Sequence, residues 1–243
     1  ALPARVWVDW ATTILRSGYA MAYLWESCWY EAVAKLILSN TPSNMIDFET
    51  IKRSMDFPID LRPIDTPTEI KDLGSKLKWR NEKSVQIRKV LMAWLDEENF
   101  AGKKLHEFIE LARANESFLI EIEEALNPDK SKPASASKLL WEATKYSLVT
   151  RELNDYYGLL QSNGRYLFTN PGVEWCAMVA SLTSPSPGIS TNLGSVVSEL
   201  QNMGIRSSTN EVLRLLEKAG LARGSADADL AVEVECAYKG ASK

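Results

Sequence analysis

Side chains that could carry acid–base, nucleophilic or metal chemistry are few in this sequence and far apart. His106 is the only histidine, and a lone histidine is more often structural than catalytic. Cys28, Cys176 and Cys236 are odd in number and widely spaced, so they form neither a disulfide scaffold nor a Cys-x-x-Cys half-site for a metal. We therefore expect reduced, mostly buried thiols and a cytoplasmic location.

The carboxylates and the known catalytic motifs give no stronger indication of an enzyme than His106 and the cysteines do. Glu121, Glu123 and Glu124 are close in sequence, but neighbouring acids on a helix point in different directions, so a solvated face is expected. The chain holds no phosphate-binding loop, dinucleotide fingerprint, His-Glu-x-x-His pair or Gly-x-Ser-x-Gly elbow. The sequence predicts a non-enzymatic protein without metal or cofactor; an enzyme using carboxylates placed by the fold is the remaining alternative.

A segment rich in lysine and arginine could bind phosphates. Between residues 71 and 89 the basic residues are Lys71, Lys76, Lys78, Arg80, Lys83, Arg88 and Lys89. Only Asp72 and Glu82 oppose them, and Trp79 lies among them. Neutralisation of phosphates by such side chains supplies the sequence-independent part of nucleic-acid affinity. Lys76, Lys78, Arg80 and Lys83 are thus candidate DNA contacts, and the alternative is a solvated helix face opposite an apolar stripe.

Overall composition limits these possibilities. The chain has 243 residues, of which 45% are hydrophobic and 25% charged, which is typical of a soluble globular protein of one to three domains. The formal net charge is -4, so any contact with DNA must come from a local patch. The chain begins at Ala1 without a signal segment, which fits either removal of the initiator methionine or a piece of a longer protein.

The N-terminal region, residues 4–39, is the most apolar part of the chain, and one or two helices are expected there, with a join near Ser17-Gly18. A membrane span needs about 20 consecutive apolar residues. The longest uncharged run ends at Arg16 and Glu26, so we expect no membrane span. The region either packs into the core or binds a larger protein partner or a second copy, because tryptophan is enriched at interfaces. Four tryptophans are the candidate partner contacts: Trp7, Trp10, Trp25 and Trp29.

Prolines and capping residues predict the order of elements in the middle of the chain. Residues 40–66 contain Pro42, Pro58 and Pro63 and are expected to connect helical blocks. Thr66-Pro67 should open a helix that runs toward Glu98, with a possible break at Gly74. Residues 101–126 form another helical block, and residues 127–137 have the composition of a linker.

The stretch from Leu148 to Trp175 predicts a helix, a tight hairpin and a second helix. Asn163-Gly164 lies between two apolar runs, and Asn-Gly is the strongest short signal for a β-hairpin. Gly158-Leu159-Leu160, the polar turn and Leu167-Phe168-Thr169-Asn170-Pro171-Gly172 resemble the end of winged-helix transcriptional regulators. The resemblance covers about 40 residues and implies a fold more than a function.

A second pattern of the same kind follows. Residues 193–203 are amphipathic, Ser208 or Thr209 can cap a helix ending near Lys218, and Glu211 is placed for a capping box. Gly220 suits the position after a helix, and residues 221–223 and 230–238 have the alternation of strands.

The predicted protein is mainly α with small β-hairpins: a helical domain over 1–130, with a break near 40–66, and winged-helix-like units over 131–183 and 188–243. Its predicted function is that of a DNA-associated regulator, or a subunit of a DNA-handling complex, acting on double-stranded DNA. The alternative is a scaffold subunit in which acidic winged helices and the tryptophan-rich region bind protein. The winged-helix resemblance and the positions of polar residues add these candidate DNA contacts: Lys145, Arg151, Arg165, Arg206, Asn210, Arg214 and Arg223.

Overall fold

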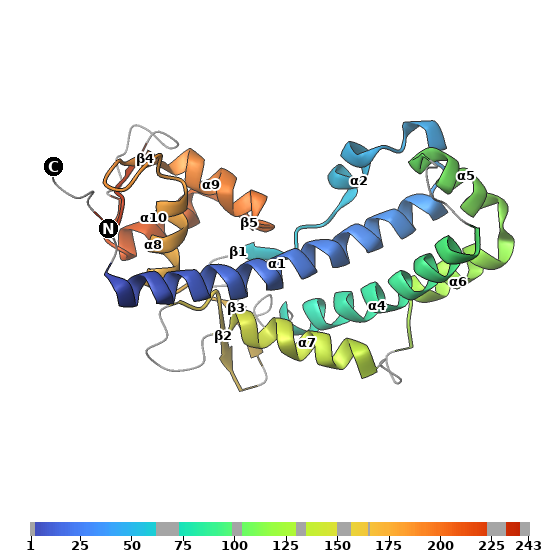
Figure 1. Cartoon of the computed structure of the whole chain (residues 1–243), viewed down its shortest axis with the longest axis horizontal. Helices are drawn as coiled ribbons and strands as arrows, with labels where there is room; N and C mark the ends of the chain where they lie inside the picture. The colour runs from blue at the N-terminus through green and yellow to red at the C-terminus, as the bar shows by residue number, and fades with distance from the viewer. Residues whose placement is uncertain are drawn as a thin grey trace. The chain divides into compact units, whose positions relative to one another are not determined.

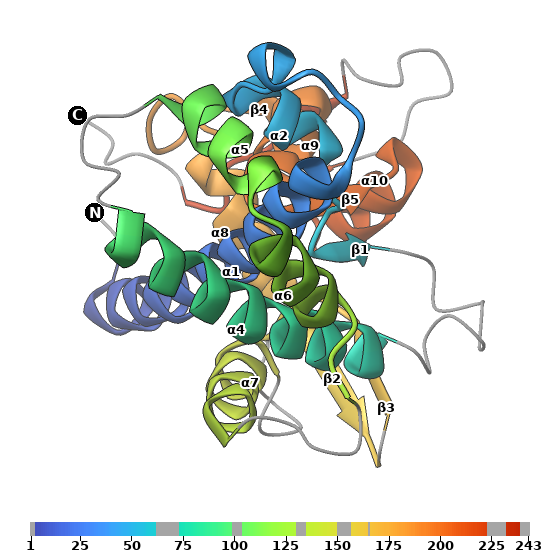
Figure 2. The same ribbon diagram turned by 90° about the vertical axis from the view of Figure 1, so that its right-hand side faces the viewer.

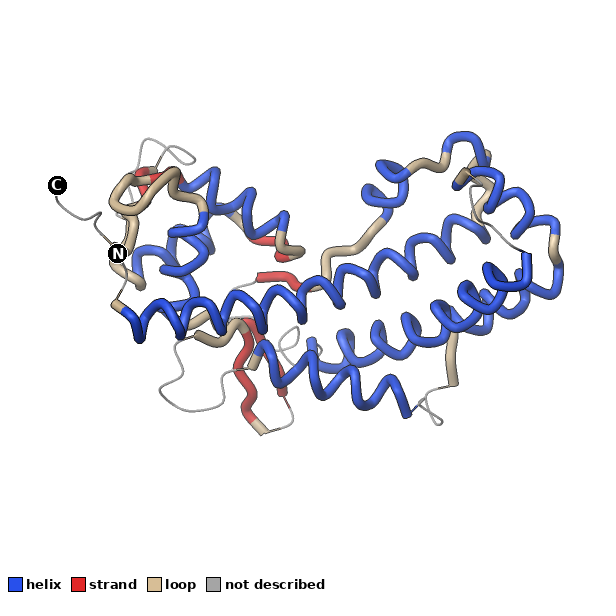
Figure 3. Tube along the Cα trace, in the orientation of Figure 1, coloured by secondary structure: helices blue, strands red, loops and turns tan. Residues whose placement is uncertain are grey.

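One long helix, α1 (Ala4–Leu38), opens the chain and continues through Ser17-Gly18 without the expected join. The computed structural model describes residues 3–61, 73–98, 104–129, 135–149, 157–164, 166–222 and 232–238. Within these ranges helices predominate and the strands are short, which confirms a mainly α protein with small β elements (Figure 3). No helix in the described ranges is both long enough and apolar enough to cross a membrane.

The chain forms two compact units, and each collects segments that are distant in sequence (Figure 1). The first contains residues 1–22, 58–75 and 144–243, and the second contains residues 23–57 and 76–143. Helix α1 contributes its first part to one unit and its second part to the other. The predicted division at 130 and 188 follows chain order instead, and it stays a prediction.

The second unit is helical. Its elements are the second part of α1, the 3-10 helix η1 (Ser43–Met45), α2 (Phe48–Ser54), most of α4 (Leu73–Glu98), α5 (Leu105–Ala114), α6 (Glu116–Leu126) and the start of α7 (Ser135–Leu148). Ile37, Ile87, Ile109 and Ile122 are buried together in its core, one from each of α1, α4, α5 and α6. The described residues of the predicted block form two helices, α5 and α6, because the Asn115 side chain accepts a hydrogen bond from the Phe118 amide at 3.1 Å and caps α6.

Arg113 closes the end of α1 in this unit. Its guanidinium donates to the backbone carbonyl oxygens of Leu36, Ile37, Ser39 and Thr41 at 2.6–2.9 Å. The last carbonyls of a helix have no partner within the helix, so a cation that binds them stabilises the helix end.

The described part of the first unit combines small sheets with helices. Its elements after α7 are β2 (Leu160–Asn163), β3 (Tyr166–Thr169), α8 (Val173–Leu182), β4 (Thr191–Asn192), α9 (Leu193–Asn202), β5 (Ile205–Ser207), α10 (Thr209–Lys218) and β6 (Glu233–Val234). The predicted hairpin is present as the antiparallel pair β2–β3, whose turn contains Gly164 at φ 59° (Figure 2). The predicted helix between Leu148 and Tyr157 falls mostly on residues 150–156, outside the described residues.

The predicted cap residues at the two ends of α10 are confirmed. Ser208 accepts a hydrogen bond from the Glu211 amide at the start of α10, and Gly220 has φ 71° just after its end. β6 pairs antiparallel with β4, and an isolated bridge joins Val234 to Ala222.

A parallel strand pair was not anticipated. β1 (Ile59–Leu61) pairs with β5, between α9 and α10, with Asp60 directly opposite Arg206. Ile59 and Ile205 are both fully buried, so the pair adds apolar contact to the backbone hydrogen bonds.

Candidate functional site

The first part of α1 carries a row of large apolar side chains on its solvent side. Trp7, Leu15 and Tyr19 are 61%, 60% and 77% exposed, and Val8 and Ile14 are also exposed. The small residues Ala11, Gly18 and Ala22 lie between them at helical spacing. We name this set of eight residues the α1 stripe.

The opposite side of the same helix packs within the first unit. Trp10 is 7% exposed, and its ring meets the Tyr238 ring edge-on at a centroid distance of 5.2 Å. The prediction of Trp10 as a partner contact is therefore corrected: its ring is part of the core. Ala20 and Met21 are buried on this side as well, so α1 is apolar on two faces.

Trp25 and Trp29 belong to the second unit and are partly covered. Trp25 lies 6.0 Å from the Phe57 ring, and Trp29 stacks on Phe48 at 5.5 Å, both measured between centroids. Their contacts hold the segment after α1 against the helix. Of the four predicted tryptophans, Trp7 alone is largely exposed.

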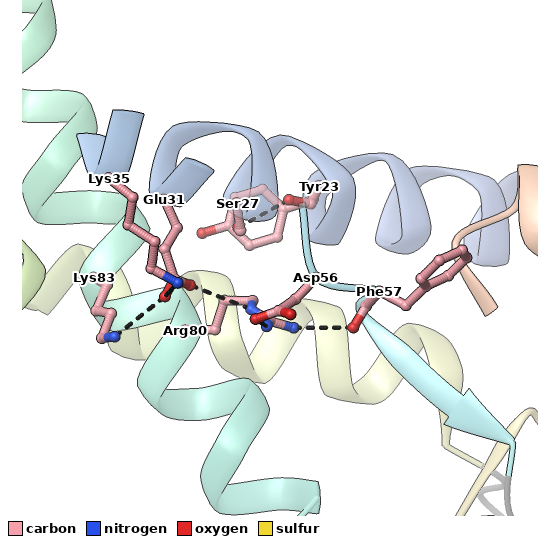
Figure 4. Close-up of polar contacts among 8 residues, drawn as sticks. All are labelled: Tyr23, Ser27, Glu31, Lys35, Asp56, Phe57, Arg80 and Lys83. Carbon is pink, nitrogen blue, oxygen red and sulfur yellow. Dashed lines mark hydrogen bonds and ion pairs between the residues drawn. The ribbon is translucent and has the colours of Figure 1, made fainter. Parts of the chain in front are cut away.

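Arg80 is the centre of a charged cluster inside the second unit (Figure 4). Its guanidinium lies 3.5 Å from Glu31 and 3.3 Å from Asp56, and it donates to the Phe57 carbonyl oxygen at 3.3 Å. Arg80 is only 5% exposed. The prediction of Arg80 as a DNA contact is therefore corrected, since a phosphate could not reach it without opening the cluster.

Glu31 receives two further cations. Lys35 and Lys83 place their Nζ atoms 2.9 Å and 3.3 Å from its Oε1. Burial favours the neutral acid, but the Lys35 hydrogen bond and the charges of Lys83, Lys35 and Arg80 outweigh it, so the pKa of Glu31 lies below its ordinary value. The nearby Cys28 thiol is buried, which raises its pKa to about 11 and keeps it protonated and unreactive.

The predicted arginine contacts on β5 and α10 carry charges that are already paired. Arg206 Nε lies 2.9 Å from Asp60, and Arg214 Nη2 lies 2.7 Å from Glu211. Asn210 is exposed at the start of α10, as a base contact would require. Any phosphate would have to compete with an internal carboxylate for each of these two arginines.

The remaining predicted DNA contacts are divided between the two units. Lys76 and Lys78 are exposed on α4, Lys83 is held by Glu31, and the Lys145 ammonium lies 5.5 Å from the Tyr146 ring centroid. Arg151, Arg165 and Arg223 lie outside the described residues. Leu77, Ile87, Leu91 and Trp94 are buried, so Lys76 and Lys78 lie on the solvated face of a core helix.

Groups suited to metal or nucleophilic chemistry are not assembled in the described ranges. There, no cluster of three or more His, Cys, Asp or Glu side chains could hold a metal ion. Glu121, Glu123 and Glu124 are exposed, as expected, and Cys176 is buried in α8, which raises its pKa to about 12.

Comparison of the chain with family models, with curated proteins and with solved structures finds no match. The α1 stripe is therefore interpreted from its own geometry. Val8, Leu15 and Tyr19 were not predicted as surface residues, because the prediction rested on the tryptophans. The available signal was that α1 is too apolar for a helix with one buried face.

Proposed function

We propose that this chain is a non-enzymatic protein-interaction subunit that binds its partner through the α1 stripe. The main evidence is that Trp7, Leu15 and Tyr19 are exposed along one side of a single helix. Contiguous exposed apolar patches on proteins mark interaction sites, whereas isolated exposed apolar residues are ordinary. Aromatic side chains are also the groups most enriched in the centres of interfaces.

We further propose that residues 173–236 are a winged-helix-like unit. The order of elements supports it: helix α8, strand β4, helix α9, strand β5, helix α10, a strand-like segment at Leu221-Ala222 and strand β6. The amide of Leu193 donates to Val232 at 2.9 Å, and the amide of Glu235 donates to Leu221 at 2.8 Å. Strand β6 thus lies between the other two segments, the arrangement that a wing requires.

Charge favours a protein partner over DNA for this unit. Arg206 and Arg214 are each neutralised by a carboxylate of the same unit, so they offer little net charge to a phosphate backbone. The whole chain also carries a net charge of -4. A winged-helix-like unit is a fold, and folds of this kind serve different partners according to the surface that they carry.

Site-specific photo-crosslinking tests the proposal. A photoreactive phenylalanine analogue would replace Tyr19, and the protein would be irradiated in the cells that naturally make it. We expect one discrete adduct on a denaturing gel, and its loss when Leu15→Glu is added, because a carboxylate in the centre of the stripe costs desolvation. The matched control places the same analogue at Lys89, an exposed residue of α4 that does not belong to the stripe.

Two results would contradict the proposal. One is an equal pattern of adducts from positions 19 and 89, which would mean that the stripe has no preferred partner. The other is an adduct from position 19 that persists unchanged with Leu15→Glu.

A further inference from the structure

We infer that the partner of the α1 stripe is a second copy of this chain, with the two α1 helices antiparallel across a two-fold axis near Leu15. This inference rests on the proposed function and names its partner. It depends on three features of the stripe: its charge, its pattern of large and small residues, and its area.

The stripe carries no charge. Between Val8 and Ala22 the charged residues are Asp9 and Arg16, and neither belongs to the stripe. Asp9 is held by Arg5 at 3.9 Å on the same helix. In a two-fold contact a residue near the axis meets its own copy, so a charge there would repel itself. The uncharged Leu15 satisfies this condition.

The order of large and small residues is self-complementary. If Leu15 meets Leu15 of the second copy, antiparallel pairing places Tyr19 opposite Ala11 and Val8 opposite Ala22. Tyr19 and Val8 then each face a small residue, which favours close packing of the two helices, while Leu15 meets its own copy at the axis.

Gly18 gives independent support. It lies in the interior of α1, where glycine is less favourable than alanine. Among the described residues, a Cβ atom added at Gly18 would meet nothing within 4 Å, so this part of the fold supplies no steric reason for glycine there. A helix backbone passing close to this position would supply one.

The area of the stripe is sufficient for a weak dimer. Its five large side chains expose on the order of 500 Å², given that one aromatic side chain carries about 150–250 Å². Two copies would therefore remove roughly 1,000 Å² from water, which is the lower limit for a specific interface.

Sedimentation velocity of the purified full chain tests the inference, over a range from about 1 to about 200 µM that brackets a weak complex. We expect the mass to rise with concentration from 27.2 kDa toward twice that value. Leu15→Glu should weaken the dimer at least tenfold, since it brings two carboxylates together at the axis. Gly18→Leu should also abolish it, because the new side chain occupies the space of the second helix.

Gly18→Leu distinguishes an effect on dimerisation from an effect on folding. The Cβ atom of the new side chain meets no other atom of the described residues, and leucine favours the helix more than glycine does. The melting temperature of this variant should equal or exceed that of the wild type at low concentration. The matched control is Leu139→Glu, which changes a 73% exposed leucine of α7 outside the stripe and should leave the dimer intact.

A wild-type chain that stays at 27.2 kDa throughout the range would overturn the inference, as would a dimer that survives Leu15→Glu. The proposed function fails separately. An adduct from position 19 that contains a different protein would leave the interaction proposal standing and remove only the second copy as the partner.

Discussion

Arg80 stabilises the second unit through a guanidinium whose side chain is only 5% exposed. It joins α4 to Glu31 of α1 and to Asp56 after α2. Removal of one partner from a buried ion pair is costly, because the remaining charge stays buried without its counter-ion.

Arg80→Ala should therefore lower the free energy of unfolding by roughly 3 kcal/mol, as measured by urea denaturation at neutral pH. Lys35→Ala removes a half-exposed member of the same cluster and should cost less than about 1 kcal/mol. Equal and small losses in both variants would contradict a structural role for Arg80.

The free energy of unfolding should depend on pH through the ionisation of Glu31. Its pKa is lowered in the folded chain, so its charged form stabilises the fold above the ordinary value of 4.5, and that contribution is lost as the pH falls through the folded pKa. Glu31→Gln should be less stable than the wild type at pH 7, and the difference should shrink below about pH 4.5. Urea titrations at several pH values measure this difference, and a gap that stays constant with pH would exclude Glu31 as its source.

Within individual helices, replacement of two glycines by alanine should change stability in opposite directions. Gly18→Ala should stabilise the isolated chain by about 0.5–1 kcal/mol, because its Cβ meets nothing and alanine favours the helix. Gly220→Ala should destabilise it by about 1–2 kcal/mol, because Gly220 has φ 71° at the end of α10. Thermal melting at low protein concentration compares them, and a gain in stability for Gly220→Ala would contradict the assigned turn.

Local signals predicted several elements well. Asn163-Gly164 indicated the β2–β3 hairpin, and Ser208 and Gly220 marked the ends of α10, because capping and positive φ depend on a few adjacent residues. The continuity of α1 through Gly18 was not predictable in this way, since packing on one face of a helix can override a weak local propensity.

Contacts between distant segments could not be predicted. The β1–β5 pair joins Ile59 to Ile205, and no local pattern carries information about such a pairing. The prediction of Arg80 as a DNA contact was wrong because it, too, used only local sequence. Its neighbours in sequence are basic, but its partners Glu31 and Asp56 come from other parts of the second unit.

For the molecule as a whole, the main question is whether it binds protein or nucleic acid. Fluorescence anisotropy of a labelled random duplex, measured at low and moderate salt, should show no salt-sensitive binding. The reason is that Arg206 and Arg214 are paired internally and the net charge is -4. Binding that weakens steeply with salt, and further with Lys76→Glu and Lys78→Glu, would instead support a DNA-associated protein.

Photo-crosslinking from position 19 reports what covers the α1 stripe in the cell, and so whether the stripe is an interaction surface. We expect a discrete protein adduct that excess duplex DNA does not compete away and that Leu15→Glu abolishes. An absence of any adduct above the Lys89 control, or an adduct that Leu15→Glu leaves unchanged, would contradict it.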